Sequence, residues 1–519
     1  MASIKVCIRC RPFTIDDDLG VNMNQAGPNN GEVELINSKY TTNRFAFSYS
    51  WWSAYGFKHH AKKNIEVAED MKLINQQMVY DDVGDELMKE LLTGSAVVMF
   101  AYGLSGSGKT FTVFGPDAAD IPEAWFKWDT PHDMWGLFPR VAYNIFQAKE
   151  ETWKIKMKYF QNVVDTVRDL MSATAKESHY KSGMRKDADG FTDIDWCTSQ
   201  VIKSWDDLRA TFLTANARKA ISPTQFNHQS TRGHCIMTIE VEKPNDDNSD
   251  MKDRGRLYVC DLAGTEPAGD IYYAQYETKT FVDDDGQKSI EKVLIGPHKD
   301  QRKTKELQSQ GMKINLSLTE MAQFFMKMAE AVKKKKLKPG QTIPGCNSYF
   351  LCKYLKDTLV SAKTYLFCAI RPEVTYHNYT YATLGFAKNA SVVKLAPKKA
   401  VSAASPAERK LLQELDQLKT LMAQLTAENT KLSTGGSGGD DTLVKQLQEQ
   451  LAAKQTSMAK AMQDGEDTSS GGGGDNSAEM TRQRDEYALR GISLTYFCGP
   501  EGEEPTSQPY LSKCVTPRN

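Results

Sequence analysis

Residues 95–110 read SAVVMFAYGLSGSGKT, an apolar run that leads directly into a glycine-rich turn. The turn fits the phosphate-binding pattern GxxxxGKT, which functions between a strand and a helix. The apolar run predicts that strand, and we expect a helix from Lys109 onward. Glycines let backbone N–H groups turn toward phosphate oxygens, the Lys109 ammonium adds positive charge, and the Thr110 hydroxyl can ligate Mg²⁺. The alternative, a glycine-rich turn with a solvated lysine, is disfavoured by the preceding strand.

Other apolar runs predict further strands of the same sheet. They lie at residues 4–10, 234–242, 256–264 and 364–370, and helix-like segments separate them. Near-continuous apolar strands that alternate with helices are typical of a sheet covered on both faces. We therefore expect an α/β fold with a central, mostly parallel sheet and helices on both faces.

The composition of the 519-residue chain restricts its class. Lys+Arg number 65 and Asp+Glu 66, a net charge of -1, which argues against a generally basic nucleic-acid binder. The longest apolar stretch, residues 96–102, is too short to cross a bilayer, and the first residues lack the apolar core of a secretion signal. The ten cysteines are scattered, which favours reduced structural thiols. We expect a cytoplasmic protein with one large domain plus appendages, no transmembrane segment and no nucleic-acid partner.

A second motif adds a carboxylate to the candidate phosphate site. In RLYVCDLAGTE, residues 256–266, Asp261 ends a predicted strand, where it suits a water-mediated Mg²⁺ contact. Gly264 can bring its backbone N–H close to a γ-phosphate because no side chain blocks the approach. Taken alone, this motif is equally compatible with an ordinary strand that ends in a turn.

A third motif, NHQSTRGH at residues 227–234, precedes another predicted strand. The hydroxyls of Ser230 and Thr231 can sense Mg²⁺ and the γ-phosphate. Arg232 could pair with Glu266 when both loops close over the nucleotide, which would make a gate that assembles only with the γ-phosphate present. As an isolated feature, the motif is more often a polar loop that caps a strand.

In this order and spacing, the three motifs resemble those of the kinesin motor domain, and the resemblance extends over roughly residues 3–395. Four segments are similar to the first strand, phosphate loop, switch I and switch II of that family: RCRPF (9–13), FAYGLSGSGKTFT (100–112), NHQSTRGH (227–234) and DLAGTE (261–266). Three more resemble its strand-and-turn, INxSL and final-helix segments: KYFQNVVDTVRDLM (158–171), INLSL (314–318) and TLGFAKNA (383–390). Within the family, FSYSWWS (47–53), VYDDVGDELM (79–88) and KKKKLK (333–338) favour the vesicle-transporting kinesin-3 class.

The resemblance implies an ATP and Mg²⁺ site. The residues expected to contact ATP are Arg9, Arg11, Pro12, Gly103, Leu104, Ser105, Gly106, Ser107, Gly108, Lys109, Thr110 and Phe111. Those expected to hold Mg²⁺ are Thr110, Ser230 and Asp261. Those expected to act in catalysis are Ser230, Thr231, Arg232, Gly264 and Glu266.

The resemblance also implies a function, a microtubule-stimulated ATPase that moves along microtubules, toward the plus end by family analogy, in intracellular cargo transport. One alternative is a nucleotide-regulated microtubule-binding scaffold with slow turnover and no motility. Another, a small GTPase or other P-loop switch, is disfavoured because the base-recognition element NKxD has no clear counterpart and the motif order differs. We expect localisation to the cytoplasm and the microtubule cytoskeleton.

An exposed lysine run is the candidate contact with the acidic microtubule surface. Its members are Lys333, Lys334, Lys335, Lys336 and Lys338. The alternative is a solvated loop. Two departures from the family pattern place track binding in question: GCNSYFL (345–351) stands where kinesins carry YRDSKLT, and an expanded segment after Glu266 contains the acidic loop FVDDDGQKS (281–289). ATP hydrolysis is therefore a firmer expectation than motility.

The chain beyond the motor domain is polar and contains glycine-rich breaks. A leucine pattern at spacings of four and three, from Leu411 to Leu432, predicts a coiled coil and a homodimer, and the alternative is a single amphipathic helix packed on the body. The predicted domains are a motor domain (1–391), a neck linker (392–405), a neck coiled coil (406–432), a flexible linker (433–441), a second short coiled coil (442–464), a polar linker (465–489) and the start of a forkhead-associated domain (490–519).

Overall fold

The computed structural model describes residues 3–15, 17–25, 29–36, 42–54, 73–118, 121–174, 176–187, 189–226, 233–246, 251–282, 288–338 and 340–403, with the helical positions 420, 422, 424 and 450. The chain divides into two compact units, residues 1–409 and 410–519. The predicted coiled coils and forkhead-associated segment lie outside the described residues, those four positions excepted.

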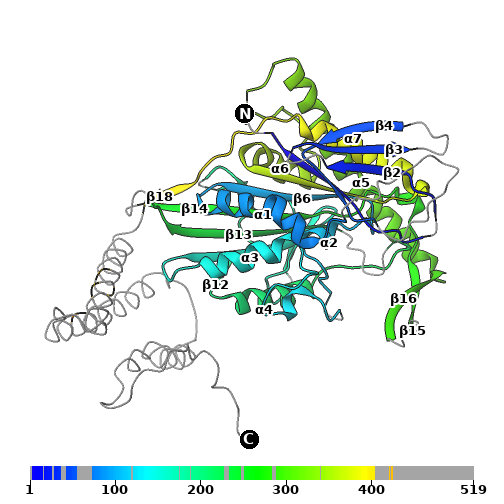
Figure 1. Ribbon diagram of the computed structural model, residues 1–519, viewed down its shortest axis with the longest axis horizontal. Coiled ribbons are helices and arrows are strands. Elements are labelled where there is room, and N and C mark those ends of the chain that lie inside the picture. Colours follow the sequence, from blue (N-terminus) through cyan, green and yellow to red (C-terminus); the bar gives the residue numbers. More distant parts are fainter. Residues whose placement is uncertain are drawn as a thin grey trace, which may run out of the picture. The chain divides into compact units, whose positions relative to one another are not determined.

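A mixed sheet forms the centre of the first unit (Figure 1), with neighbouring strands in the order β5-β1-β17-β6-β14-β13-β7-β8-β9. Their bounds are β1 Lys5–Cys10, β5 Tyr49–Trp52, β6 Ala96–Gly103, β7 Lys154–Val163, β8 Thr166–Asp169, β9 Glu177–His179, β13 His234–Pro244, β14 Met251–Asp261 and β17 Lys363–Ile370. The pairings from β5 through β14 are parallel, and those from β14 through β9 are antiparallel. The predicted parallel core is therefore confirmed, and antiparallel strands extend it on one side.

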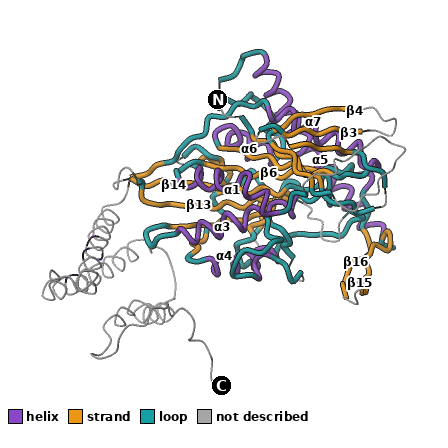
Figure 2. Tube along the Cα trace, viewed as in Figure 1, coloured by secondary structure: helices purple, strands orange, loops and turns teal. Residues whose placement is uncertain are grey.

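Helices cover both faces of this sheet (Figure 2) because the strand residues of the core are apolar on both sides. Along β6, Val97 and Met99 pack in one apolar cluster, whereas Val98 and Phe100 pack in the other. The first cluster includes side chains of α1 (Gln76–Leu92), α2 (Lys109–Val113), α3 (Leu137–Ala148) and α4 (Trp205–Asn216). The second includes side chains of α5 (Gln301–Lys333), α6 (Phe350–Ser361) and α7 (His377–Ser391).

Smaller elements surround the central sheet. They are the sheet of β2 (Val21–Gln25), β3 (Gly31–Ile36) and β4 (Thr42–Phe47), the hairpin of β10 (Met184–Lys186) and β11 (Thr192–Ile194), and the 3-10 helices η1 (Trp125–Lys127), η2 (Ala268–Asp270) and η3 (Val374–Tyr376). The strands β12 (Gln200–Ile202) and β18 (Val401–Ala403) belong to the central sheet itself, where they pair with β7 and β14. Within the described part of the chain, no helix combines the length and apolar character needed to span a bilayer. The described cysteines are free thiols, and all but Cys346 are buried.

The expanded segment after Glu266 differs from the loop that the sequence suggested. It forms an antiparallel hairpin of β15 (Ala274–Val282) and β16 (Lys288–Pro297), which projects away from the central sheet in Figure 1. The strands form because β15 alternates Tyr276, Thr278 and Thr280, residue types that favour extended backbone. Residues 283–287, which include the acidic run, lie outside the described residues.

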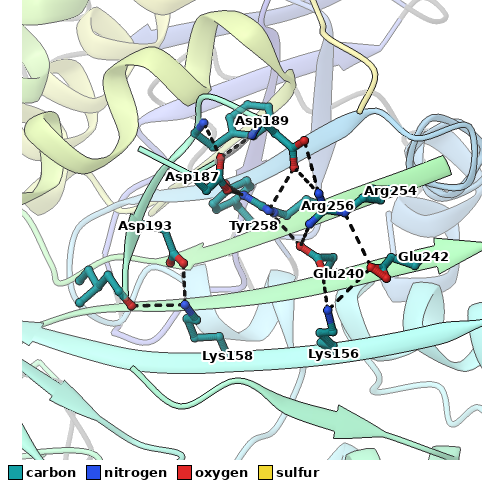
Figure 3. A network of polar contacts seen from close by, with 12 residues as sticks. Lys156, Lys158, Asp187, Asp189, Asp193, Glu240, Glu242, Arg254, Arg256 and Tyr258 are labelled. Carbon is teal, nitrogen blue, oxygen red and sulfur yellow. Dashed lines mark hydrogen bonds and ion pairs between the residues drawn. The ribbon is translucent and has the colours of Figure 1, made fainter. Parts of the chain in front are cut away.

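A network of ion pairs, shown in Figure 3, joins the β10–β11 hairpin to β7, β13 and β14. Arg256 of β14 pairs with Glu240 at 2.9 Å and also with Asp187 of the hairpin loop, while Lys158 of β7 pairs with Asp193 at 2.7 Å. Arg256 is aligned with Ala96, the first residue of β6. The network therefore lies at the opposite end of β6 from Gly103, roughly 23 Å away for a strand of this length.

The described part of the predicted neck linker follows the body closely. The N–H of Ala396 donates to the carbonyl of Val360 at 2.9 Å, and that of Ala400 donates to the carbonyl of Gly94 at 2.9 Å. Strand β18 then pairs with the first residues of β14. The linker and the candidate site at Asp261 are thus attached to opposite ends of one strand.

Candidate nucleotide-binding site

The glycine-rich turn begins where β6 ends and closes where α2 starts. Gly103 has a φ of 144°, and a Cβ atom there would overlap the carbonyl oxygen of Ala369 on β17. Gly108 caps α2 in the left-handed region, with a φ of 100°. Only glycine combines these conformations with such close backbone packing. The strand, turn and helix predicted from residues 95–110 are therefore present, although α2 ends at Val113.

Lys109 lies inside this turn. Its side chain is buried, and its ammonium donates to the carbonyl oxygens of Gly103 at 3.1 Å and Leu104 at 2.9 Å. The charge is thus held within the loop by backbone carbonyls. A phosphate group bound in the loop would replace these acceptors with a charged one, which forms a stronger hydrogen bond.

The turn meets β14 through Thr110 and Asp261. The Thr110 hydroxyl donates to Oδ2 of Asp261 at 2.7 Å, whereas Oδ1 of this buried carboxyl has no hydrogen-bond partner among the described residues. Burial raises the pKa of Asp261, and the charge of Lys219, the Thr110 hydrogen bond and the charge of Lys109 oppose that rise. A hydroxyl beside an unsatisfied carboxylate oxygen fits the oxygen ligands that Mg²⁺ prefers.

The loop after β14 packs directly on the glycine-rich turn. The buried carboxylate of Glu266 accepts a hydrogen bond from the Ser105 N–H at 3.0 Å. A Cβ atom at Gly264 would overlap this carboxylate, so the glycine is required for the close approach. Asn315 of α5 donates to the Glu266 carbonyl at 2.7 Å and so attaches α5 to the loop.

Switch I is described only at its end. Ser230, Thr231 and Arg232 lie outside the described residues, so the pairing of Arg232 with Glu266 stays a prediction. His234 begins β13 and is buried, and neither ring nitrogen has a partner among the described residues. Burial lowers the pKa of His234 to about 3, so the ring is neutral at physiological pH.

The end of β1 supplies the residues expected beside the base. The Arg9 guanidinium donates to the Gln76 side-chain carbonyl at 2.6 Å and lies 5.5 Å from the ring centre of Phe111. Burial lowers the pKa of Arg9 to about 10, which leaves it protonated at neutral pH. Arg11 donates to the carbonyl of Gly106, so the predicted base side contacts the predicted phosphate side.

Some residues of this site carry no sequence motif. The Gln76 amide donates to the Phe111 carbonyl at 2.6 Å and thereby joins Arg9 to α2. Lys219, whose side chain is 5% exposed, pairs with Asp117 at 3.3 Å. Gln76 could have been suspected only from its place at the start of a predicted helix, and no pattern in the sequence indicates Lys219.

The predicted track-binding lysines form a separate cluster. Lys333 ends α5, and Lys334, Lys335, Lys336 and Lys338 follow it, all exposed. Lys334 pairs with Glu330 at 3.7 Å. Because Asn315 of the same helix contacts Glu266, the cluster begins about 27 Å along the helix axis from that contact.

The chain is similar to kinesins in its family model, its sequence and its fold. The model of the kinesin motor domain matches residues 14–280. Kinesin-like protein unc-104 of Caenorhabditis elegans is 25% identical over 409 residues, which cover 76% of this chain and 22% of that protein. KIF1A of Rattus norvegicus is 24% identical over 414 residues, covering 76% and 21%. Human kinesin-1 heavy chain is 30% identical over 197 residues, covering 37% and 19%.

A solved structure supports the same fold. The motor of KIF14, as a dimer in complex with a microtubule, superposes with a TM-score of 0.57 at 18% identity, over 79% of this chain and 99% of that one. The chain spans about a fifth of the length of the curated relatives it matches. The resemblance to the kinesin-3 class is confirmed, because unc-104 and KIF1A are members of that class. With a matched family model over residues 14–280 and the phosphate loop and Glu266 in direct contact, this chain belongs to the kinesin motor-domain family.

Proposed function

We propose that this chain is a microtubule motor that hydrolyses ATP to move along its track, toward the plus end by family analogy, and that it transports intracellular cargo. One observation carries the proposal: Lys109, Asp261 and Glu266 converge on one glycine-rich turn at the carboxyl ends of β6 and β14. In parallel α/β sheets, ligands bind at this edge. Family membership, and the similar KIF14 structure in complex with a microtubule, support the proposed coupling to microtubules.

The residues of the candidate nucleotide site have distinct proposed roles. The backbone N–H groups of residues 103–110 and the Lys109 ammonium bind the phosphate chain. Thr110, Asp261 and Ser230 would hold Mg²⁺. Mg²⁺ bound by these residues would supply positive charge that offsets the negative charge of the phosphate chain. Arg9, Arg11, Pro12 and Phe111 would flank the adenine, and the Phe111 ring suits stacking on it.

The switch loops are proposed to report the γ-phosphate. Gly264 leaves room for its backbone N–H to approach that phosphate, while Ser230 and Thr231 sense it from switch I. When the loops close, the Glu266 carboxylate releases the Ser105 N–H and pairs with Arg232. This closed pair holds the attacking water. Because Glu266 also contacts α5 through Asn315, closure is transmitted to the helix that ends at the lysine cluster.

The partner of the lysine cluster is proposed to be the microtubule, whose surface is acidic. The exposed positions of Lys333 to Lys336 and Lys338 support this pairing. A homodimer through residues 406–432 and a cytoplasmic, microtubule-associated localisation complete the proposal. The cargo would be bound by parts of the protein other than the motor domain.

The proposal is tested by measuring ATP turnover with and without microtubules, followed by gliding of microtubules over immobilised protein. We expect microtubules to stimulate turnover and to glide in an ATP-dependent manner. Stimulated turnover without gliding would favour the non-motile scaffold, to which the altered segment GCNSYFL is suited. Absence of ATP turnover under both conditions would contradict the proposed enzyme.

A further inference from the structure

Arg371 lies between the two halves of the nucleotide site. It directly follows β17, the strand between β1 and β6. The Arg11 N–H donates to the Ile370 carbonyl at 3.2 Å, and Ala369 is aligned with Gly103. Sheet order therefore places Arg371 between the end of β1, on the base side, and the glycine-rich turn, on the phosphate side.

The guanidinium of Arg371 is held in a fixed orientation. Its side chain is 6% exposed, and it donates to Oε1 of Glu373 at 3.1 Å and to Oε2 at 3.3 Å. It also donates to the Thr14 hydroxyl, and its carbon Cζ lies 3.8 Å from the ring centre of Tyr376. A planar group held by paired hydrogen bonds and a ring face is a geometry that lysine cannot reproduce.

Glu373 extends this arrangement to the segment after RCRPF. Its carboxylate, which is fully buried, accepts from the Thr14 N–H at 2.9 Å and from the Thr14 hydroxyl at 3.0 Å. The segment that follows Arg11 and Pro12 is thus bound to Arg371 in two ways. Its Thr14 hydroxyl accepts a hydrogen bond from Arg371 directly, and Thr14 also donates to Glu373, the ion-pair partner of Arg371.

On its other side, Arg371 reaches the glycine-rich turn. Its Nη1 lies 4.0 Å from the place that a Cβ atom of Gly106 would occupy. Gly106 has a φ of 72°, and its carbonyl accepts a hydrogen bond from Arg11. The same position is 2.8 Å from the carbonyl oxygen of Phe226, which directly precedes switch I. Arg11 therefore holds the Gly106 carbonyl, and the Arg371 guanidinium lies next to the same residue without a hydrogen bond to it.

We propose that Arg371 is a positioning residue of the nucleotide site, which fixes the separation between the RCRPF segment and the glycine-rich turn. The inference rests on the proposed binding of ATP at this turn. A nucleotide bridges both sides, so its affinity depends on their separation, and misplacing one side costs affinity for the whole ligand. The phosphate chain alone does not extend to the RCRPF segment, so its affinity does not depend on that separation.

The test compares ligands with and without a base. The principal variant is R371Q/E373Q, which replaces the buried ion pair by two neutral side chains that can still hydrogen-bond each other. Binding of MgATP, MgADP and inorganic tripolyphosphate would be measured by calorimetry on the full chain, with thermal unfolding as a check of folding. We expect ATP and ADP affinities to fall about 10-fold and tripolyphosphate affinity to change by less than about two-fold.

A matched control comes from the network in Figure 3. R256Q/D187N neutralises another arginine–carboxylate pair, at the opposite end of β6, and should leave all three affinities unchanged. R371K keeps the charge but loses the planar group. It should weaken the binding of ATP by about three-fold without affecting the binding of tripolyphosphate. R371K decides the question if R371Q/E373Q does not fold.

The outcomes separate this inference from the proposed function. Unchanged ATP and ADP affinities in the folded Arg371 variants would overturn it. An equal loss for tripolyphosphate would also overturn it, since Arg371 would then act on the turn alone. If the unsubstituted protein binds neither ATP nor ADP, the proposed function itself fails.

Discussion

At the scale of single residues, Glu266 connects the phosphate turn to the rest of the molecule. Its carboxylate accepts the Ser105 N–H, and its carbonyl accepts the Asn315 amide. If Glu266 closes the gate by pairing with Arg232, then Glu266 is required for stimulated hydrolysis but not for the binding of ATP. We expect Glu266→Ala to keep ATP affinity within about three-fold and to lose about 100-fold in microtubule-stimulated turnover.

Lys109→Ala provides the contrast for that experiment. Removing the ammonium that we propose to bind the phosphate chain should weaken ATP binding itself by about 100-fold, the value of a charged hydrogen bond. Calorimetry and steady-state turnover distinguish the two variants. Normal stimulated turnover in Glu266→Ala would contradict the gate.

His234 should make stability depend on pH. Burial lowers its pKa from 6.5 to about 3, so between these values the unfolded chain binds a proton that the folded chain does not. The free energy of unfolding therefore falls as pH drops below about 6.5, by up to about 1.4 kcal/mol per pH unit. His234→Phe removes the titrating group. Between pH 7 and pH 5, we expect the free energy of unfolding to decrease by about 2 kcal/mol less in this variant than in the unsubstituted protein.

Urea unfolding at the two pH values measures this difference. An identical pH dependence in the His234→Phe variant and the unsubstituted protein would show that His234 does not contribute.

At the scale of elements, the lysine cluster at the end of α5 should govern the salt dependence of track binding. Changing Lys334, Lys335 and Lys336 to Gln removes three exposed charges. We expect microtubule affinity to fall at least about 10-fold in low salt and its dependence on salt concentration to flatten, because fewer charge contacts remain to be screened.

Cosedimentation with microtubules at several salt concentrations provides the measurement. The control changes three exposed lysines elsewhere on the motor domain, Lys127, Lys154 and Lys203, to Gln. If both triple variants lose affinity equally, only total charge matters. If neither does, the cluster is a solvated loop.

The elements that the sequence predicted well are those with a local signal. The strand, turn and helix around Lys109 are contiguous, so spacing alone identifies them. For the hairpin β15–β16, the acidic run FVDDDGQKS indicates a loop, and the strand-favouring residues on either side of it carry no comparable local motif. Arg371 could not be assigned to the site, because only the sheet order β1-β17-β6 brings it beside Gly106.

At the scale of the whole molecule, one strand connects the nucleotide site to the chain that leaves the motor domain. Strand β14 ends at Asp261, and its first residues pair with β18 of the linker. Because close-packed interiors have low compressibility and transmit strain, we expect a shift at one end of β14 to be felt at the other. Strand β14 thus directly connects the candidate site at Asp261 with the linker.

The coiled coil predicted after this linker decides whether two such motors act together. The leucine pattern predicts that Leu415 and Leu418 lie in the apolar seam and that Gln413 and Gln417 lie outside it. We expect the full chain to dimerise with rising concentration in sedimentation experiments, the variant Leu415→Lys/Leu418→Lys to remain monomeric, and the control Gln413→Lys/Gln417→Lys to dimerise. A chain that is monomeric at every concentration, and that the leucine changes destabilise, would instead place this helix on the motor's own body. The distinction matters mechanically, because only a dimer keeps a second motor at high effective concentration near the track while the first detaches.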